Sequence, residues 1–294
     1  MNLKDKLFYK LFIKSVNDFF EEECLKFSAS LTYYTIFALP SFAIILITFL
    51  GYFLGEEEVS GNLFRQINRM VGNQASSQIQ EIINNSKLTK TSIIETIIGV
   101  ITLLFSASGM FGEIQSSIND IWKIKAKNRK GMIKAVIDQF FSFSMIAVFG
   151  FILAVSLLID SFIDVLYDKI AKVVNIEKLL IADYLDSFLV FLIITFIIVY
   201  VFKELPDAVI KFKDAFIGAL FTAILFMIGK WVIGEYLENS DKFTLYGTAG
   251  SILILLLWIY YSAIILYFGA VFTKNYALIY GNSIVPNEYS DFKE

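Results

Sequence analysis

The chain consists of long apolar blocks separated by shorter polar segments. A helix needs roughly 20 apolar residues to cross a hydrocarbon core of about 30 Å. Six blocks meet or approach that length, at 28–54, 92–111, 138–159, 186–202, 214–234 and 248–273. Barrel strands would alternate apolar and polar positions over about ten residues, whereas these blocks are continuously apolar. The pattern therefore predicts an all-α, polytopic membrane protein with six transmembrane helices.

A second periodicity precedes the first block. Within residues 1–27, apolar side chains such as Leu7, Leu11 and Phe19 recur at spacings of three and four, and Lys10 and Lys14 lie opposite them. This spacing predicts an amphipathic helix. Such a helix can lie in the cytoplasmic interface, with its lysines toward lipid headgroups and its phenylalanines in the acyl boundary. Docking against the helix bundle explains the same pattern.

The positions of lysine and arginine predict how the chain is oriented, because cytoplasmic segments carry an excess of both. The N-terminal stretch, the links after the second and fourth blocks and the tail at 274–294 hold sixteen of the 25 basic residues, and the alternate segments hold eight. Both termini are therefore expected in the cytoplasm. The external segments, at about 55–91 and 160–185, have apolar residues at helical spacing and are expected to form short helices within a transmembrane domain at 28–273.

Composition agrees with a lipid environment and narrows the partners. Hydrophobic residues make up 57% of the chain and charged residues 18%, against roughly 45–50% and 25% in soluble domains. The formal net charge is −3, which provides no basic excess to follow a phosphate backbone, so we expect no nucleic-acid partner. The single cysteine, Cys24, excludes an internal disulfide and a CxxC pair, and we interpret it as a small buried apolar residue.

Several classes of enzyme are disfavoured by missing residues. The chain has no histidine, which removes histidine-dependent zinc sites and Ser/His/Asp or Cys/His catalysis. It has no GxxxxGK[ST] phosphate loop, and no carboxylate pair has a spacing that nominates it for acid and base catalysis. We therefore expect no catalytic, cofactor or metal site, and a protein that is not an enzyme.

Four ionisable residues fall at or near the predicted spans, where charge costs about 2.5–3.5 kcal/mol on insertion scales. Glu95 begins the second span and Glu113 ends it, Lys230 lies in the outer half of the fifth, and Glu235 follows it. They are candidates for a substrate or polar pathway. In one interpretation Lys230 snorkels outward and pairs with an acidic neighbour; in the other it binds an anionic headgroup.

A basic cluster follows Trp122 at the end of the second span and comprises Lys123, Lys125, Lys127, Arg129 and Lys130. Such a cluster beside an interfacial aromatic residue is typical of a topology determinant. Binding of anionic lipid headgroups is the more specific hypothesis.

Small residues and a proline mark candidate hinge or packing positions. Gly109 and Gly112 stand in one small-residue run, and Gly247 and Gly250 in another. Small residues allow helices to approach closely in lipid, and broken-helix gates are the functional alternative. Pro40, midway through the first span, is expected to kink it.

Four stretches of the chain resemble a known family. They are FSASLTYYTIFALPS at 27–41, LLFSASGMFGEIQSSINDIW at 103–122, ELPDAVIKFKDAFIGALFTAILFMIGK at 204–230 and LYGTAGSILILLLWIYYSAIILYFGAVFT at 245–273. The chain is similar in these stretches to the YihY/BrkB family of bacterial inner-membrane proteins, long labelled ribonuclease BN-like. The resemblance implies a six-helix inner-membrane protein, associated in some members with serum resistance or with export of envelope lipid. A ribonuclease is not expected, because histidine ligands are absent.

Two functional hypotheses follow from the residues and the resemblance together. The first is a transporter or flippase-like protein for an amphipathic or anionic envelope component, with membrane lipids and their anionic headgroups as partners. The second is a scaffold that does not transport, and that binds an envelope-assembly partner or forms a homo-oligomer through its small-residue faces.

Overall fold

The computed structural model describes part of the chain. The described residues are 3–38, 60–61, 63–65, 68, 76–81, 109–127, 178–238 and 248–293. Several predicted features lie outside the described residues: the span at 138–159, most of both external segments, Pro40, Glu95 and Gly247, and Arg129 and Lys130 of the basic cluster. The described residues include three long helices and parts of the first two predicted spans.

The three long helices form the centre of the structure. They are α7 (Lys178–Glu204), α8 (Phe212–Glu238) and α9 (Thr248–Ile279). Within them Ser187–Glu204, Phe212–Ile233 and Leu253–Ile279 are long and apolar enough to cross a membrane. These segments coincide with the predicted spans at 186–202, 214–234 and 248–273. Of the first two predicted spans, the structure describes helical residues up to 38 and from 109 onward.

Helices α8 and α9 pack through a reciprocal glycine–threonine contact. A Cβ atom added at Gly218 of α8 would collide with Thr273 of α9, and one added at Gly269 of α9 would collide with Thr222 of α8. Each threonine hydroxyl donates a 2.7 Å hydrogen bond to the carbonyl of the glycine four residues earlier on its own helix. The hydroxyls are thereby satisfied in a dry interface, and the backbones can approach closely.

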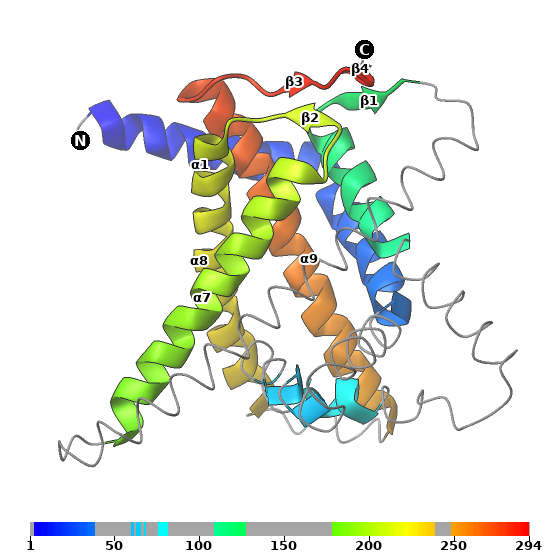
Figure 1. Ribbon diagram of the computed structural model, residues 1–294, viewed down its shortest axis with the longest axis vertical. Coiled ribbons are helices and arrows are strands. Elements are labelled where there is room, and N and C mark those ends of the chain that lie inside the picture. The colour runs from blue at the N-terminus through cyan, green and yellow to red at the C-terminus, as the bar shows by residue number, and fades with distance from the viewer. Residues whose placement is uncertain are drawn as a thin grey trace, which may run out of the picture.

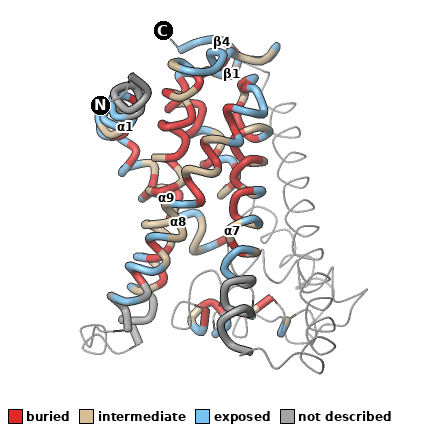
Figure 2. The backbone as a smooth tube through the Cα atoms, turned by 90° about the vertical axis from the view of Figure 1, so that its left-hand side faces the viewer, coloured by how far each residue is buried: buried red, intermediate tan, exposed pale blue. Residues whose placement is uncertain are grey.

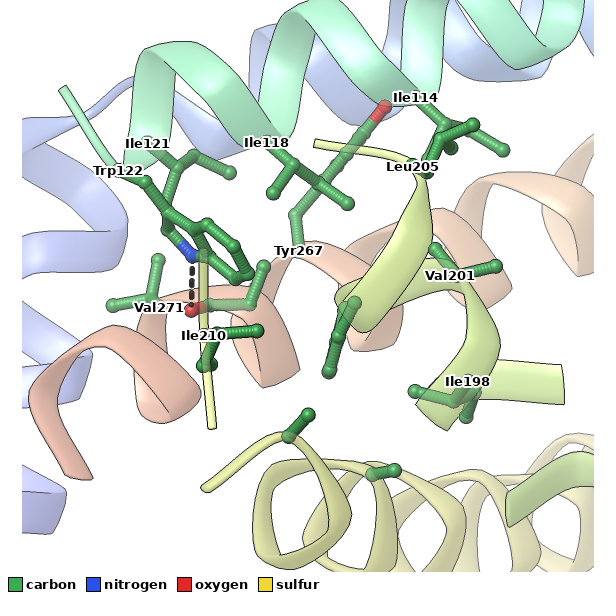
Figure 3. Packing of buried hydrophobic residues seen from close by; sticks show 14 of the residues in the cluster. Ile114, Ile118, Ile121, Trp122, Ile198, Val201, Leu205, Ile210, Tyr267 and Val271 are labelled. Atoms are coloured by element: carbon green, nitrogen blue, oxygen red, sulfur yellow. Dashed lines mark hydrogen bonds between the residues drawn. The ribbon is translucent and has the colours of Figure 1, made fainter. Parts of the chain in front are cut away.

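The apolar core joins α7, α8 and α9 to two helical segments nearer the N-terminus, at 24–38 and 109–121. Figure 2 shows buried positions running along the inner faces of the bundle. In Figure 3, Ile118 of helix 109–121 lies beside Tyr267 of α9, and Ile121 lies on the side of Val271. Helix 109–121 therefore belongs to the bundle and extends ten residues beyond the predicted end of the second span at 111.

Helix α1 (Leu3–Glu21) runs across one end of the bundle (Figure 1). It turns into helix 24–38 through Glu23, whose φ of 53° lies in the left-handed region. Leu11, Ser15 and Phe19 are buried, and α1 packs against α9. The N-terminal periodicity allowed either docking on the bundle or an interfacial position. One face of α1 docks on the bundle.

Two short antiparallel ladders close the same end, so the chain is mostly helical and not all-α. Strand β1 (Ile124–Ala126) pairs with β4 (Ser290–Phe292), and β2 (Ala208–Val209) pairs with β3 (Val285–Pro286). The sequence reasoning missed them because two- and three-residue strands carry no alternating pattern. Both chain termini also lie at this end of the bundle (Figure 1), which is called the cap below.

Candidate functional site

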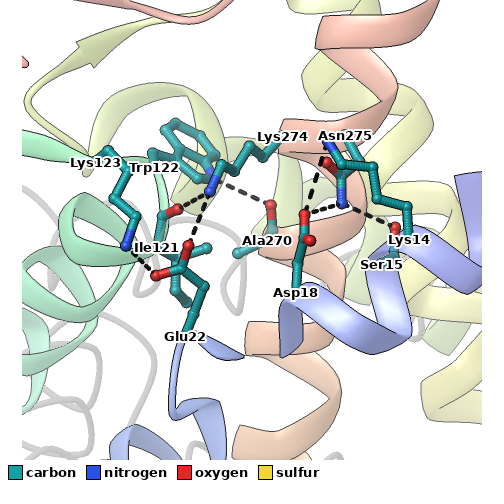
Figure 4. Close-up of polar contacts among 10 residues, drawn as sticks. All are labelled: Lys14, Ser15, Asp18, Glu22, Ile121, Trp122, Lys123, Ala270, Lys274 and Asn275. Carbon is teal, nitrogen blue, oxygen red and sulfur yellow. Dashed lines mark hydrogen bonds and ion pairs between the residues drawn. The ribbon is translucent and has the colours of Figure 1, made fainter. Parts of the chain in front are cut away.

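The cap is held together by charged side chains that come from distant parts of the chain. Glu22, which follows α1, accepts from Lys274 of α9 at 3.3 Å and also pairs with Lys123, which follows helix 109–121. Lys274 donates a second bond of 2.7 Å to the carbonyl of Ile121. Glu22 and Lys274 are largely buried, with side chains about one-sixth exposed. One carboxylate therefore joins three segments (Figure 4).

A second polar contact attaches α1 to α9. The buried amide of Asn275 donates to Asp18 at 2.8 Å and to the Ser15 hydroxyl at 3.3 Å. Lys14 approaches Asp18 at 3.9 Å from the preceding turn. Figure 4 shows this contact one helical turn from the Glu22 bridge. Together the two contacts fix the direction in which α1 crosses the bundle.

A third contact connects helix 109–121 with the link between α7 and α8. Asn119 donates to the Asp207 carboxylate at 2.9 Å and accepts from the Asp207 backbone amide at 2.8 Å. Ser290 of β4 donates to the Asp207 carbonyl at 2.6 Å. Trp122, buried in the core, donates its indole N–H to the carbonyl of Ala270 at 3.0 Å. Asn119 and Trp122 thus have structural roles at the cap.

The basic cluster is partly neutralised at the cap. Lys123 pairs with Glu22, and Lys127 pairs with Asp291 at 3.2 Å. Lys125 is exposed on β1, where it stands opposite Asp291. Surface pairs of this kind contribute little energy, yet they offset the positive charge that an anionic headgroup would need. The described part of the cluster is thus mainly occupied with the protein's own carboxylates.

A polar group deeper in the bundle is the candidate functional site. Tyr267 of α9 is 0% exposed, and no group among the described residues completes a hydrogen bond to its hydroxyl. That hydroxyl points toward helix 109–121 (Figure 3), where its polar neighbours include Ser117 and Glu113. Ser117 donates a long bond of 3.4 Å to the Glu113 carboxylate. These three oxygen-bearing side chains, Glu113, Ser117 and Tyr267, are called the inner polar site below.

The inner polar site lies below the cap, where Tyr267 and Ser117 are buried and Glu113 is partly exposed. Glu113 precedes Trp122 by nine residues, which corresponds to about 13 Å along a helix. The flanking residues Ile114 and Ile118 are buried. The sequence placed Glu113 at the end of a span, whereas the continuation of helix 109–121 places it within the bundle.

Lys230 and Glu235 lie elsewhere. Both are on α8, five residues apart, and Lys230 is half-buried while Glu235 is exposed. Lys230 is 18 residues into α8, about 27 Å from the cap. The structure therefore does not bring Lys230 and Glu235 together with Glu113.

The predicted packing glycines differ among themselves. A Cβ atom at Gly109 would stand 3.1 Å from the ring of Tyr34, which fits close packing of helix 109–121 on helix 24–38. Gly112 is exposed, with no described atom within 4 Å of such a Cβ. Gly250 lies in the first turn of α9.

Sequence reasoning missed Ser117 and Tyr267. A serine and a tyrosine are ordinary residues in a transmembrane helix, and these two are 150 positions apart in the chain. The available signal was a glutamate followed four residues later by a serine, a spacing that places both side chains on one helix face. Glu22, Asp18 and Asp207 were missed for the same reason, because their partners are remote in sequence.

Comparison with known proteins places this geometry in a family. The model of the family described as virulence factor BrkB matches residues 15–286. The UPF0761 membrane protein NTHI0384 of Haemophilus influenzae 86-028NP is 26% identical over 254 residues, which cover 86% of this chain and 89% of the relative. A UPF0761 membrane protein of H. influenzae PittEE is 27% identical over 215 residues, covering 72% of this chain and 75% of the relative.

A UPF0761 membrane protein of Xanthomonas oryzae pv. oryzae PXO99A is 26% identical over 261 residues; the match covers 88% of this chain but 59% of that longer relative. No solved structure matches the chain. The family match spans nearly all of the sequence and confirms the resemblance seen in its four stretches. The chain therefore belongs to the BrkB virulence factor family of membrane proteins.

Proposed function

We propose that this protein is a transporter or flippase-like protein that moves an amphipathic or anionic lipid of the bacterial envelope across the inner membrane. The observation that carries the proposal is the inner polar site. A buried hydroxyl without a hydrogen-bond partner costs about 1–3 kcal/mol, and a carboxylate within a span is costly as well. A bundle with only a structural role would gain by replacing these groups with apolar ones, so their presence favours a passing polar ligand.

Helix α1 supports a function at the lipid surface. Beside its docked face, Tyr9, Ile13 and Phe20 are exposed, and Lys10 and Lys14 stand on the next sector. Because α1 crosses the end of the spanning helices (Figure 1), we infer that its apolar sector enters the acyl boundary while its lysines meet headgroups. The cap then faces the cytoplasm, in agreement with the distribution of basic residues.

A specific observation favours the scaffold as the second candidate. The contacts at the cap and the glycine–threonine interface join the described helices tightly, and a scaffold requires rigidity. A transporter accommodates the same contacts if its moving parts lie away from the cap.

Lipid movement in proteoliposomes separates the two functions. The purified full chain is reconstituted with trace fluorescent phospholipids, and the fraction accessible to a membrane-impermeant reductant is followed with time. A transporter or flippase-like protein raises that fraction above the half that lies in the outer leaflet. Variants Glu113→Gln and Tyr267→Phe are expected to slow the movement, whereas Glu204→Gln, at an exposed carboxylate of the cap, is the matched control.

Traces identical to empty vesicles for zwitterionic and anionic lipids alike would contradict the proposed function and favour the scaffold.

A further inference from the structure

We propose that the inner polar site binds a positively charged ammonium group, carried on the headgroup of the amphipathic substrate. This inference rests on the proposed function and specifies the part of the substrate that is recognised. The inference concerns the chemistry of the groups that converge on Glu113. The cationic group that it names differs from the anionic headgroup expected from the basic cluster.

The site itself offers a negative charge and neutral oxygens. Glu113 supplies the carboxylate, and the hydroxyls of Ser117 and Tyr267 can accept hydrogen bonds. An ammonium group has several N–H donors and no acceptor, so it can satisfy the carboxylate and the unpartnered Tyr267 oxygen together. A phosphate would be repelled by the carboxylate, and it would find only two hydroxyls to donate to it.

Helix 24–38 carries an aromatic cluster, one member of which lies a helical turn from the site. The ring of Tyr34 abuts Gly109, one helical turn from Glu113. Tyr33 contacts Tyr34 edge-on at 5.9 Å and Phe37 at 5.1 Å between ring centroids. All three rings are exposed. Aromatic faces attract ammonium groups, and a carboxylate with neighbouring aromatic rings is a combination suited to cations.

Three lysines among the described residues do not pair with Glu113. Lys123 and Lys274 are engaged by Glu22 at the cap, and Lys230 lies toward the opposite end of α8. Among the described residues, no salt bridge is formed by Glu113, whose carboxylate accepts the long bond from Ser117.

Helix 109–121 exposes part of its surface beside the carboxylate. Gly112, adjacent to Glu113, is exposed and borders open space among the described atoms. Glu113 itself is partly exposed. A headgroup moving past the exposed rings of helix 24–38 could reach the carboxylate there while its acyl chains stay in lipid.

Binding is measured separately from transport. The purified full chain in detergent is titrated with short-chain phosphatidylethanolamine and, in parallel, with short-chain phosphatidylglycerol, and the shift in thermal unfolding temperature is recorded. A ligand that binds the native state raises that temperature, and at a fixed concentration the rise grows with the logarithm of its affinity. We expect phosphatidylethanolamine to raise the unfolding temperature more than phosphatidylglycerol does. Glu113→Gln should weaken the affinity for phosphatidylethanolamine about ten-fold or more, because a charge-assisted contact is lost.

Tyr267→Phe provides a second variant with a distinctive signature. Removing an unpartnered buried hydroxyl should leave the unliganded protein equally stable or more stable, yet the response to phosphatidylethanolamine should fall. A variant that merely disturbs folding would lower both. Tyr260→Phe, on the same helix, and Glu204→Gln serve as matched controls with unchanged response.

Soluble probes identify the source of the ammonium. Methylammonium or ethanolamine that competes with phosphatidylethanolamine in a Glu113-dependent manner supports recognition of the ammonium group itself. Three outcomes would overturn the inference: equal responses to both lipids, a response of Glu113→Gln equal to that of the native chain, or a response to Na⁺ alone. Selective binding of phosphatidylethanolamine without lipid movement would support the ammonium site and contradict transport. Lipid movement that is independent of the headgroup and insensitive to Glu113→Gln would support transport and contradict the ammonium site.

Discussion

Individual residues decide how closely the helices approach. At Gly218 and Gly269 the space that a Cβ atom would take is filled by a threonine of the other helix. At Gly112 no described atom occupies that space. The three positions look alike in the sequence, as glycines within predicted helices, and the packed structure alone distinguishes them.

Alanine at either buried glycine should destabilise the bundle. For Gly218→Ala or Gly269→Ala we expect a loss of about 1–3 kcal/mol in the free energy of unfolding, because the added methyl overpacks the interface. Denaturant titration in mild detergent measures this loss. Gly112→Ala is the control, and it should be neutral or slightly stabilising because alanine favours helix. Equal effects at all three positions would contradict the glycine–threonine interface.

Cys24 provides a residue-scale prediction on reactivity and pH. Burial raises the pKa of its thiol to about 12 from an ordinary value near 9, with a smaller contribution from the Glu22 carboxylate. The thiolate is the reactive form, so the folded chain should resist maleimide at pH 8 and react once unfolded. Mass spectrometry of the labelled protein measures the difference. Rapid labelling of the folded chain would show that Cys24 is accessible.

The same shift has a consequence for stability. Above pH 9 the unfolded thiol ionises while the folded one stays protonated, so the folded state binds more protons. Its contribution to stability is complete below pH 9 and declines as the pH rises toward 12. Cys24→Ala should flatten that part of the stability profile.

At the scale of elements, α1 divides into sectors with different surroundings. Leu11, Ser15 and Phe19 face α9, while Ile13 and Phe20 are exposed. The Glu22 bridge and the Asn275 contact hold this orientation, and the periodicity of the sequence alone allowed either of two directions for the apolar surface. Tertiary contacts therefore determine which apolar side chains remain for lipid.

Spin labels on α1 test its position in the membrane. In nanodiscs, a label replacing Ile13 or Phe20 should be more accessible to oxygen, which concentrates in the acyl region, than to a water-soluble nickel reagent. Labels at Lys10 or Asn17 should show the opposite preference. A label at Phe19 should be protected from both and is the packing control. Preferential contact of Ile13 and Phe20 with the nickel reagent would exclude the interfacial position.

At the scale of the whole molecule, the two chain termini lie at the same end of the bundle, the cap (Figure 1). The pairing of β1 with β4 brings the C-terminal residues beside the end of helix 109–121. The cap also contains most of the described lysines, and its carboxylates offset much of their charge. The predicted orientation therefore rests on the position of basic residues along the sequence rather than on the net charge of the folded surface.

Reporter fusions test the orientation. Green fluorescent protein attached after Glu294 should fluoresce, and alkaline phosphatase at the same position should be inactive, because we expect the C-terminus in the cytoplasm. Single cysteines introduced near each terminus should resist an impermeant thiol reagent in intact spheroplasts and react after lysis. Termini that report opposite compartments would contradict the predicted six-span topology.

Sequence alone determined the solvent and the family of this protein. Long apolar blocks need lipid around them, and three of them coincide with helices suited to span a membrane, because hydropathy is a local property of consecutive residues. The four matching stretches likewise identified the family before any contact was known. The sequence identified Glu113 as a polar residue at the end of a span. It could not give the depth of Glu113 in the bundle, because the apolar block ends near 111 while the helix continues.

Only the tertiary structure decided which residues meet. Tyr267 joins Glu113 and Ser117 across about 150 positions, and Glu22 joins Lys123 and Lys274 across 101 and 252 positions. Such contacts depend on how the helices cross and on how closely glycines let them approach. Neither can be predicted from a local sequence pattern. The basic cluster could be located from the sequence, whereas its neutralisation by carboxylates follows from packing, because the partners come from opposite ends of the chain.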